Sequence, residues 1–306
     1  MKQTKNQIVM LMVFLGIGSI GLCAEPFAEG PYLGQTPPGP IAQVFAPGLI
    51  CNTRPKTWEA FGTFSADGNT FCYQRVNGVF ITENTDQGWT TPELIRSIPA
   101  NMYSPWSACL SPDANSIFLT RAAGPVSKNN LYRCNRAARG WDKPQQLGAP
   151  LSSPSHEVTC SLAANNNVYL TSGPRGGDGR SRLWFAPFVD NTWARAEQIF
   201  LDHPHAGDPG IAPDESFMVF TSINLPGGYG HRDIYITLRL PDGTWSKPRN
   251  LGPRINTAYI EHGPRISPDK KYLFFNRSNG WDLRIDSVES DIYWVELKEY
   301  LPESYR

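Results

Sequence analysis

Short runs of alternating apolar and polar residues fill the chain from residue 59 onward, and this period of two predicts β-strands. The runs come in pairs around a turn in which Pro or Ala usually precedes Asp, as in "ISPDKKYLFF" at 266–275. Pro presets the turn, and an Asp side chain can bond to the backbone two residues on. Each pair therefore reads as a hairpin, with its turn at Asp67, Asp113, Asn165, Asp214 or Asp269.

Two more strands follow each hairpin. The third strand reads "GVFIT" (78–82), "NLYRC" (130–134), "RLWFA" (182–186), "DIYIT" (233–237) or "DIYWV" (291–295). The fourth carries a Trp that is usually followed, after two residues, by Pro, as in "DGTWSKPRNLG" at 242–252. Its tryptophans stand 52 residues apart, at Trp89, Trp141, Trp193 and Trp245.

Four strands in each repeat of roughly 50 residues predict an all-β fold, a β-propeller of four-stranded blades. Proline suits the fourth strand because that strand forms the outer edge of a blade. The tryptophans are expected to pack between neighbouring blades, which is a structural role.

Five blades are predicted, from repeats near 59–103, 104–153, 156–203, 206–257 and 261–300. The fifth repeat stops after its third strand, and "PGPIAQVFAPGLICNT" at 38–53 resembles "KPRNLGPRINT" at 247–257. An N-terminal strand is therefore expected to complete the last blade. Six blades are the alternative, if residues 25–58 hold more strand. The propeller is expected to be a single domain, 38–300, with a linker at 25–37 and a tail at 301–306.

These segments carry a family likeness. "ISPDKKYLFF" followed by "DIYWV", and "IAPDESFMVFTS" followed by "GGYGHRDIYIT", resemble the WD40-like β-propeller repeats called PD40. Such repeats form the propeller of the periplasmic translocation protein TolB and occur in many exported bacterial proteins. The likeness covers about residues 59–297 and is degenerate in the third repeat, where "LAANNN" replaces Ser-Pro-Asp-Gly. It implies a fold rather than one function, because propellers serve many functions.

The first two dozen residues differ from the rest. Lys2 and Lys5 precede the uncharged run "IVMLMVFLGIGSIGL", and small residues follow, so we expect a signal peptide 1–24 cut near Ala24. A retained anchor is the alternative, but the run is short for a membrane span. Lipidation at Cys23 is disfavoured because Leu22 stands where such signals have a small residue. The protein is therefore expected to be periplasmic or secreted, with no membrane span after cleavage.

Charge and cysteine content narrow the classes of partner. The 28 basic and 28 acidic residues balance, so no basic excess is available for nucleic acid. Five cysteines remain after cleavage without close spacing, and they do not form a disulfide framework: Cys51, Cys72, Cys109, Cys134 and Cys160. Cys72, Cys109 and Cys160 lie in strand patterns and are expected to be small buried apolar residues, while their disulfide state stays open.

The candidate binding residues are expected to lie on one face of the propeller. We call it the loop face: the innermost strands begin there, and the connections between repeats and the second-to-third strand loops lie there. All five histidines fall on it with several carboxylates, which gives a candidate binding set of Glu59, His156, Glu157, Asp202, His203, His205, Asp208, His231, Glu261 and His262. Such a set could hold a divalent metal, with His203, His205 and Asp208 as candidates, or hydrogen-bond a sugar or peptide. The alternative is that loops simply hold polar residues; no other cofactor is indicated.

Some polar residues recur at fixed offsets, which favours a structural role. Arg75, Arg121 and Arg277 each stand eight residues after their turn Asp. Asp233 and Asp291 each precede "IY" and are expected to tie a loop to its strand.

Two classes of function remain. The first is a non-catalytic binding or scaffold propeller that recognises a protein, peptide or cell-surface glycan through the loop face. The second is a carbohydrate-active enzyme, in which Glu59, Glu157, Asp208 and Glu261 would supply an acid and a base or nucleophile. The chain carries no Gly-x-Ser-x-Gly elbow, phosphate-binding glycine loop or HExxH motif. Binding is favoured, because the three glutamates hold equivalent repeat positions.

Overall fold

The computed structural model describes residues 27–52, 57–99, 107–122, 129–153, 155–173, 181–199, 201, 203, 205–223, 225–280 and 288–306, without the side chains of residues 121 and 122. The expected signal peptide and Asp202 lie outside these residues. In the described part the only helical segments are two 3-10 turns, η1 (Pro31–Gly34) and η3 (Glu303–Tyr305). No helix in these ranges is long and apolar enough to cross a membrane.

The strands of the described residues fall into groups along the chain, which we call units 1 to 5. Unit 1 holds β2 (Glu59–Phe64), β3 (Thr70–Arg75), β4 (Gly78–Thr85), β5 (Gly88–Trp89) and β6 (Glu93–Leu94). Unit 2 holds β7 (Ala108–Leu110), β8 (Ser116–Ala122), β9 (Asn129–Asn135) and β10 (Gln145–Gln146). Unit 3 holds β11 (His156–Leu162), β12 (Val168–Gly173), β13 (Arg182–Ala186) and β16 (Glu197–Gln198), with the small hairpin β14 (Phe188–Val189) and β15 (Thr192–Trp193). Unit 4 holds β17 (Gly207–Ile211), β18 (Phe217–Ile223), β19 (Arg232–Leu238) and β20 (Arg249–Asn250). Unit 5 holds β21 (Ile260–Ile266), β22 (Tyr272–Ser278) and β23 (Ser290–Glu296).

Each unit is an antiparallel meander whose strands pair in chain order, apart from two short additions: β5 and β6 both pair with β4 in unit 1, and β14 pairs with β15 in unit 3. Unit 5 gains its fourth strand from the other end of the chain: β1 (Gln43–Val44) pairs antiparallel with β23, with Gln43 opposite Trp294. This is the pairing that the likeness between 38–53 and 247–257 predicts. One parallel pair, Arg232 with Ile260, joins the sheets of units 4 and 5.

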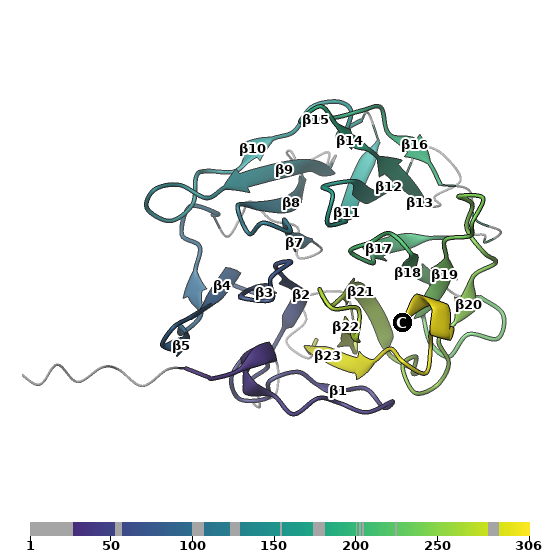
Figure 1. Ribbon diagram of the computed structural model, residues 1–306, viewed down its shortest axis with the longest axis horizontal. Coiled ribbons are helices and arrows are strands. Elements are labelled where there is room, and N and C mark those ends of the chain that lie inside the picture. The colour runs from purple at the N-terminus through teal and green to yellow at the C-terminus, as the bar shows by residue number, and fades with distance from the viewer. Residues whose placement is uncertain are drawn as a thin grey trace, which may run out of the picture.

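The units surround a common centre (Figure 1). Their first strands, β2, β7, β11, β17 and β21, lie innermost, and each contacts the next, with β21 contacting β2. The side chains around this axis are therefore contributed by every unit. They close around a cavity of about 60 Å³ at which Arg265 meets residues of the other inner strands.

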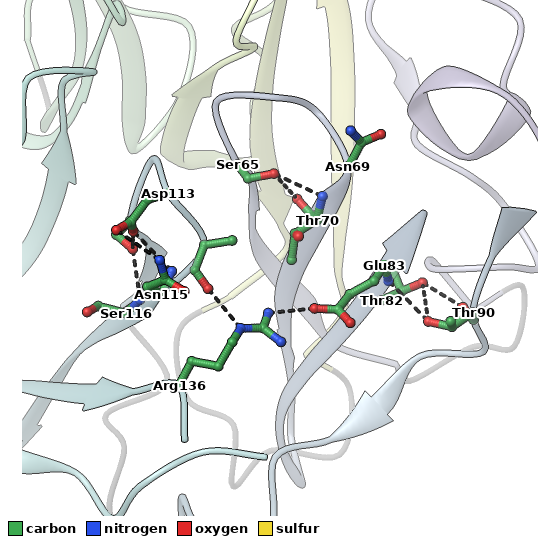
Figure 2. A network of polar contacts seen from close by, with 12 residues as sticks. Ser65, Asn69, Thr70, Thr82, Glu83, Thr90, Asp113, Asn115, Ser116 and Arg136 are labelled. Atoms are coloured by element: carbon green, nitrogen blue, oxygen red, sulfur yellow. Dashed lines mark hydrogen bonds and ion pairs between the residues drawn. The ribbon is translucent and has the colours of Figure 1, made fainter. Parts of the chain in front are cut away.

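The hairpin turns have the predicted chemistry. Oδ1 of Asp67 accepts bonds from the Asn69 N–H (2.9 Å) and the Ser65 hydroxyl (2.6 Å). The side chains at the other four turns accept the same bond from the N–H two residues on. Figure 2 shows the region of these turns in units 1 and 2, where Arg136, directly after β9, pairs with Glu83 of β4 and donates to the Ala114 carbonyl. The turns themselves are joined by the Ala66 N–H, which donates to the Pro112 carbonyl (2.8 Å). The turns therefore set the hairpin register locally and also link neighbouring units.

The hydrophobic core consists of clusters that lie between neighbouring units, and each fourth-strand tryptophan packs in one of them. Trp141 packs at the boundary of units 1 and 2, Trp193 at that of units 2 and 3, and Trp245 at that of units 3 and 4. Trp89 is fully buried in the cluster that joins units 5 and 1. The predicted packing between neighbours is confirmed, and its reason is burial of the largest apolar side chain where two sheets meet.

The segment before β1 also packs on the body. Leu33 of η1 is buried in the cluster of units 5 and 1, and the Trp89 indole donates to the Gly30 carbonyl (2.7 Å). At the other end, the Tyr305 hydroxyl donates to the Arg239 carbonyl (2.8 Å).

The five described cysteines are buried and unpaired, so the structure contains no disulfide among them. The prediction that Cys72, Cys109 and Cys160 act as small buried residues is confirmed.

Candidate functional site

Two of the candidate glutamates are held by arginines of their own units. Arg75 Nε lies 3.3 Å from Glu59 Oε1, and Arg277 Nε lies 2.8 Å from Glu261 Oε1. Each pair spans a hairpin, because the Glu stands eight residues before the turn Asp and the Arg eight after, directly opposite in register. Both carboxylates are buried.

Each of these arginines is enclosed on further sides. The Arg277 guanidinium lies 4.3 Å from the centre of the Tyr293 ring and donates to the Ile255 carbonyl (2.8 Å). The Arg75 guanidinium lies 5.3 Å from the Phe80 ring and donates to the Ile50 carbonyl (2.8 Å). A carboxylate, an aromatic ring and a carbonyl therefore form one repeated arginine site, used in units 1 and 5.

Burial governs the titration of these glutamates. It raises the pKa of Glu59 to about 7, although the nearby Arg75 acts in the opposite direction. It also raises the pKa of Glu261, opposed by bonds from Thr257 and Arg277. Because both glutamates are buried and paired with an arginine, their main role is structural.

Asp208 has a different setting at the axis. It lies in a bulge of β17 with φ 47°, and it forms an ion pair with Arg232. Its carboxylate also accepts from the hydroxyls of Thr159 (3.2 Å) and Thr221 (3.1 Å), which joins units 3 and 4. Burial opposes ionisation, but Arg232 and the other donors outweigh it and hold the pKa of Asp208 below its usual range.

The histidines of the loop face do not share one environment. His262 is buried against the Phe61 ring, and burial lowers its pKa to about 3, so it is neutral at ordinary pH. His203 packs edge-on against Tyr235, with Nδ1 2.6 Å from the His205 carbonyl oxygen. His156 begins β11, where its Nδ1 accepts from the Asn129 N–H, and His231 is exposed.

The predicted metal candidates are not brought together. Within the part of the chain that the structure describes, no three His, Cys, Asp or Glu side chains converge as metal ligands would, and this includes His203, His205 and Asp208. The binding role of the full candidate set stays a prediction.

Asp233 has the expected structural role. Its carboxylate accepts from the N–H groups of Tyr229 (2.9 Å) and Gly230 (3.1 Å), which holds the loop against β19.

Glu157 is the candidate that differs from its equivalents. Its Oε1 accepts from the Ser153 N–H (3.0 Å) and hydroxyl (2.7 Å), as Glu261 accepts from Thr257 in unit 5. Opposite it in register stands Ser172 in place of an arginine. Among the described residues no Lys or Arg forms an ion pair with it. Its Oε2 is buried without a hydrogen-bond partner, a property that Oε2 of Glu59 shares. Burial raises the pKa of Glu157.

A groove of about 710 Å³ lies beside Glu157, between the 149–155 connection and the sheet of unit 3. Trp184, Ser172 and Leu151 line it together with the carboxylate, and Arg195 stands at an exposed position of its wall. Sequence reasoning selected Glu157 but missed Trp184, Ser172 and the groove. The signal was available: unit 3 is the repeat with a Glu eight residues before the turn position and Gly173, not Arg, eight after.

No protein-family model and no curated protein sequence matches the chain, so the PD40 likeness stays a prediction. Solved structures do match it. A glycoside hydrolase superposes with a TM-score of 0.52 at 12% identity, over 84% of this chain and 92% of that one. TolB from Acinetobacter baumannii gives 0.48 at 12% identity, over 78% of this chain and 54% of TolB, so this chain spans about half of that protein's length. A putative TolB from Agrobacterium tumefaciens gives 0.47 at 15% identity, over 76% and 80%.

The strand order, the ring of inner strands and the superposition on the glycoside hydrolase define an all-β fold of the β-propeller class. At such identities the likeness extends to the fold alone.

Proposed function

We propose that the chain is an exported binding protein, a five-bladed propeller closed by β1, that recognises a protein, peptide or glycan through its loop face. The observation that carries the proposal is the groove beside Glu157. It is open to solvent, lined by an aromatic ring, hydroxyls and a carboxylate, and large enough for a peptide side chain or a sugar ring. Export is supported by the basic and apolar N-terminal sequence.

Glycoside cleavage has less support. It needs two carboxylates that face the same substrate, one of them free to act as base or nucleophile. Glu59, Glu261 and Asp208 are each bound to an arginine, and Glu157 faces a separate groove. The hydrolase neighbour supports the fold and supplies no residue of a mechanism.

The test is a thermal-unfolding screen of the full exported chain against peptides and cell-surface glycans, in which a bound ligand raises the midpoint. Ala196 lines the groove, and Ala196→Trp is expected to fill it and abolish the rise. Pro248 holds the same repeat position in unit 4, so Pro248→Trp is the matched control and should keep the rise. A ligand whose effect survives Ala196→Trp would place recognition elsewhere.

A further inference from the structure

We propose that the groove of unit 3 binds the guanidinium group of an arginine side chain presented by a peptide or partner protein, between the Glu157 carboxylate and the Trp184 ring. This inference rests on the proposed binding function and names the chemistry that the groove recognises. It follows from comparing unit 3 with units 1 and 5, in which the glutamate forms an ion pair with an arginine of the same unit.

The aromatic part of the repeated arginine site is present in unit 3. Phe80 and Tyr293, on which the internal arginines lie, are the third residues of their strand motifs and pair with Tyr73 and Phe275. Trp184 holds this position in unit 3 and pairs with Leu170. Indole is the strongest of the three rings for a cation above its face.

The polar part is also present. Ser153 binds Glu157 four residues ahead of it, as Thr257 binds Glu261, although both Ser153 donors bind Oε1 whereas the Thr257 donors bind one oxygen each. Leu151 stands six residues before Glu157, as Ile255 stands before Glu261, and the Ile255 carbonyl is the one that accepts from Arg277. Both Leu151 and Glu157 line the groove.

The arginine alone is replaced. Ser172 lies opposite Glu157, and its hydroxyl is 3.5 Å from Oε1. Oε2 is buried without a hydrogen-bond partner in the described structure, as Oε2 of Glu59 also is, but no Lys or Arg of the described residues forms an ion pair with Glu157. An unpaired buried carboxylate oxygen is costly, and a guanidinium satisfies it with a charge-assisted bond. The groove runs beside the carboxylate, and Oε2 itself has no exposed surface, so a partner's guanidinium reaches it only when the groove lining moves aside.

Unit 4 shows the other outcome of losing the arginine. The residues eight before and eight after its turn Asp are Ala206 and Ser222, so both the carboxylate and the arginine are absent. Unit 3 lacks the arginine but keeps the Glu157 carboxylate, the Trp184 ring and the Ser153 donors. This set fits a site whose cation comes from a partner molecule.

The probe is the peptide Ac-Gly-Arg-Gly-NH₂, titrated into the full chain by calorimetry beside the same peptide with citrulline, the neutral isostere of arginine. We expect the arginine peptide to bind at least about 10-fold tighter, since bonds to charged groups contribute roughly 1.5–3 kcal/mol. Glu157→Gln is expected to remove this difference. Equal binding of both peptides, or unchanged binding by Glu157→Gln, overturns the inference.

A second variant tests the site from inside. Ser172→Arg places an arginine opposite Glu157, as in units 1 and 5, and should abolish peptide binding and raise the unfolding midpoint above that of Ser172→Gln. The gain should vanish when Glu157→Gln is added. If Ser172→Arg gives no gain and leaves peptide binding intact, the geometry proposed here is wrong.

The two proposals fail differently. A neutral peptide or glycan that binds the wild type, and is blocked by Ala196→Trp, overturns the arginine specificity and leaves the binding function standing. If no ligand responds to Ala196→Trp, the groove is not the binding site and both proposals fall.

Discussion

The buried pair of Arg277 and Glu261 allows a sharp test of the repeated arginine site. Arg277→Met keeps most of the side-chain volume and removes the charge. It deletes the 2.8 Å bond to Glu261, the bond to the Ile255 carbonyl and the contact with the Tyr293 ring. Only the Thr257 donors then remain on a carboxylate that has no exposed surface.

The expected loss of unfolding free energy is about 3–5 kcal/mol near neutral pH, because removing one partner of a buried ion pair leaves the other charge uncompensated. Solvent screening reduces this little, since the arginine side chain is 16% exposed and the carboxylate 0%. Adding Glu261→Gln should restore a large part of the loss, because a neutral amide is cheaper to bury than a charge.

The pH dependence has a definite sign. Burial raises the pKa of Glu261, and loss of Arg277 raises it further. An acid with a raised native pKa holds its proton in the folded state, so its penalty is small at acidic pH and grows as pH rises through the native value. The difference between Arg277→Met and wild type should therefore be smaller near pH ~5 than near pH ~8.

Urea unfolding followed by tryptophan fluorescence measures both effects, with Arg254→Met as the control. Arg254 and Glu299 also form an ion pair, at 2.6 Å, but their side chains are 55% and 54% exposed. Loss of that pair should cost less than about 1 kcal/mol. A loss of similar size for both variants, or a double variant less stable than Arg277→Met alone, would refute the reasoning.

Three further predictions concern other parts of the fold. Gly263→Ala should lower the unfolding midpoint by several degrees, since φ is 57° and a Cβ would lie 2.8 Å from Phe61, whereas Gly148→Ala meets nothing and should leave the midpoint unchanged. Trp89→Ala should lose about 3–5 kcal/mol in urea unfolding, because this 1% exposed side chain fills the junction of units 5 and 1. Burial raises the pKa of Glu59 to about 7, so the contribution of Glu59 to stability should fall as pH rises from about 4.5 to that value, and Glu59→Gln should gain urea midpoint relative to wild type over this range.

The repeat was predictable because its signals are local. A turn Asp bonds two residues on, and a Trp needs a large buried position, so neither depends on distant parts of the chain. The pairing of β1 with β23 joins the ends of the described chain, yet it followed from internal repetition. The opposition of Glu59 and Arg75 could have been derived as well, since both stand eight residues from Asp67.

The environment of the candidate site was less predictable. Position on a loop face does not say which side chains point to solvent: His262 is buried and neutral, whereas His231 is exposed. Asp208 meets Arg232 and Thr159 because β17 bulges at that residue, and a bulge changes the direction of a side chain without a clear mark in the sequence. The groove of unit 3 depends on how a connection lies against a neighbouring sheet, which is a tertiary property.

The stability of the arginine sites in units 1 and 5 can be compared with that of the groove in unit 3, which has no arginine of its own. Arg277→Met makes unit 5 resemble unit 3, so its measured loss approximates the cost of keeping Glu157 without an internal cation. Ser172→Arg makes the reverse change, and its gain should approach the same magnitude if the two sites are built alike. A gain well below the loss would mean that unit 3 has already reduced the cost, for example by water entering the groove beside the carboxylate. In that case a bound guanidinium has less free energy to recover, and the arginine peptide should bind correspondingly more weakly.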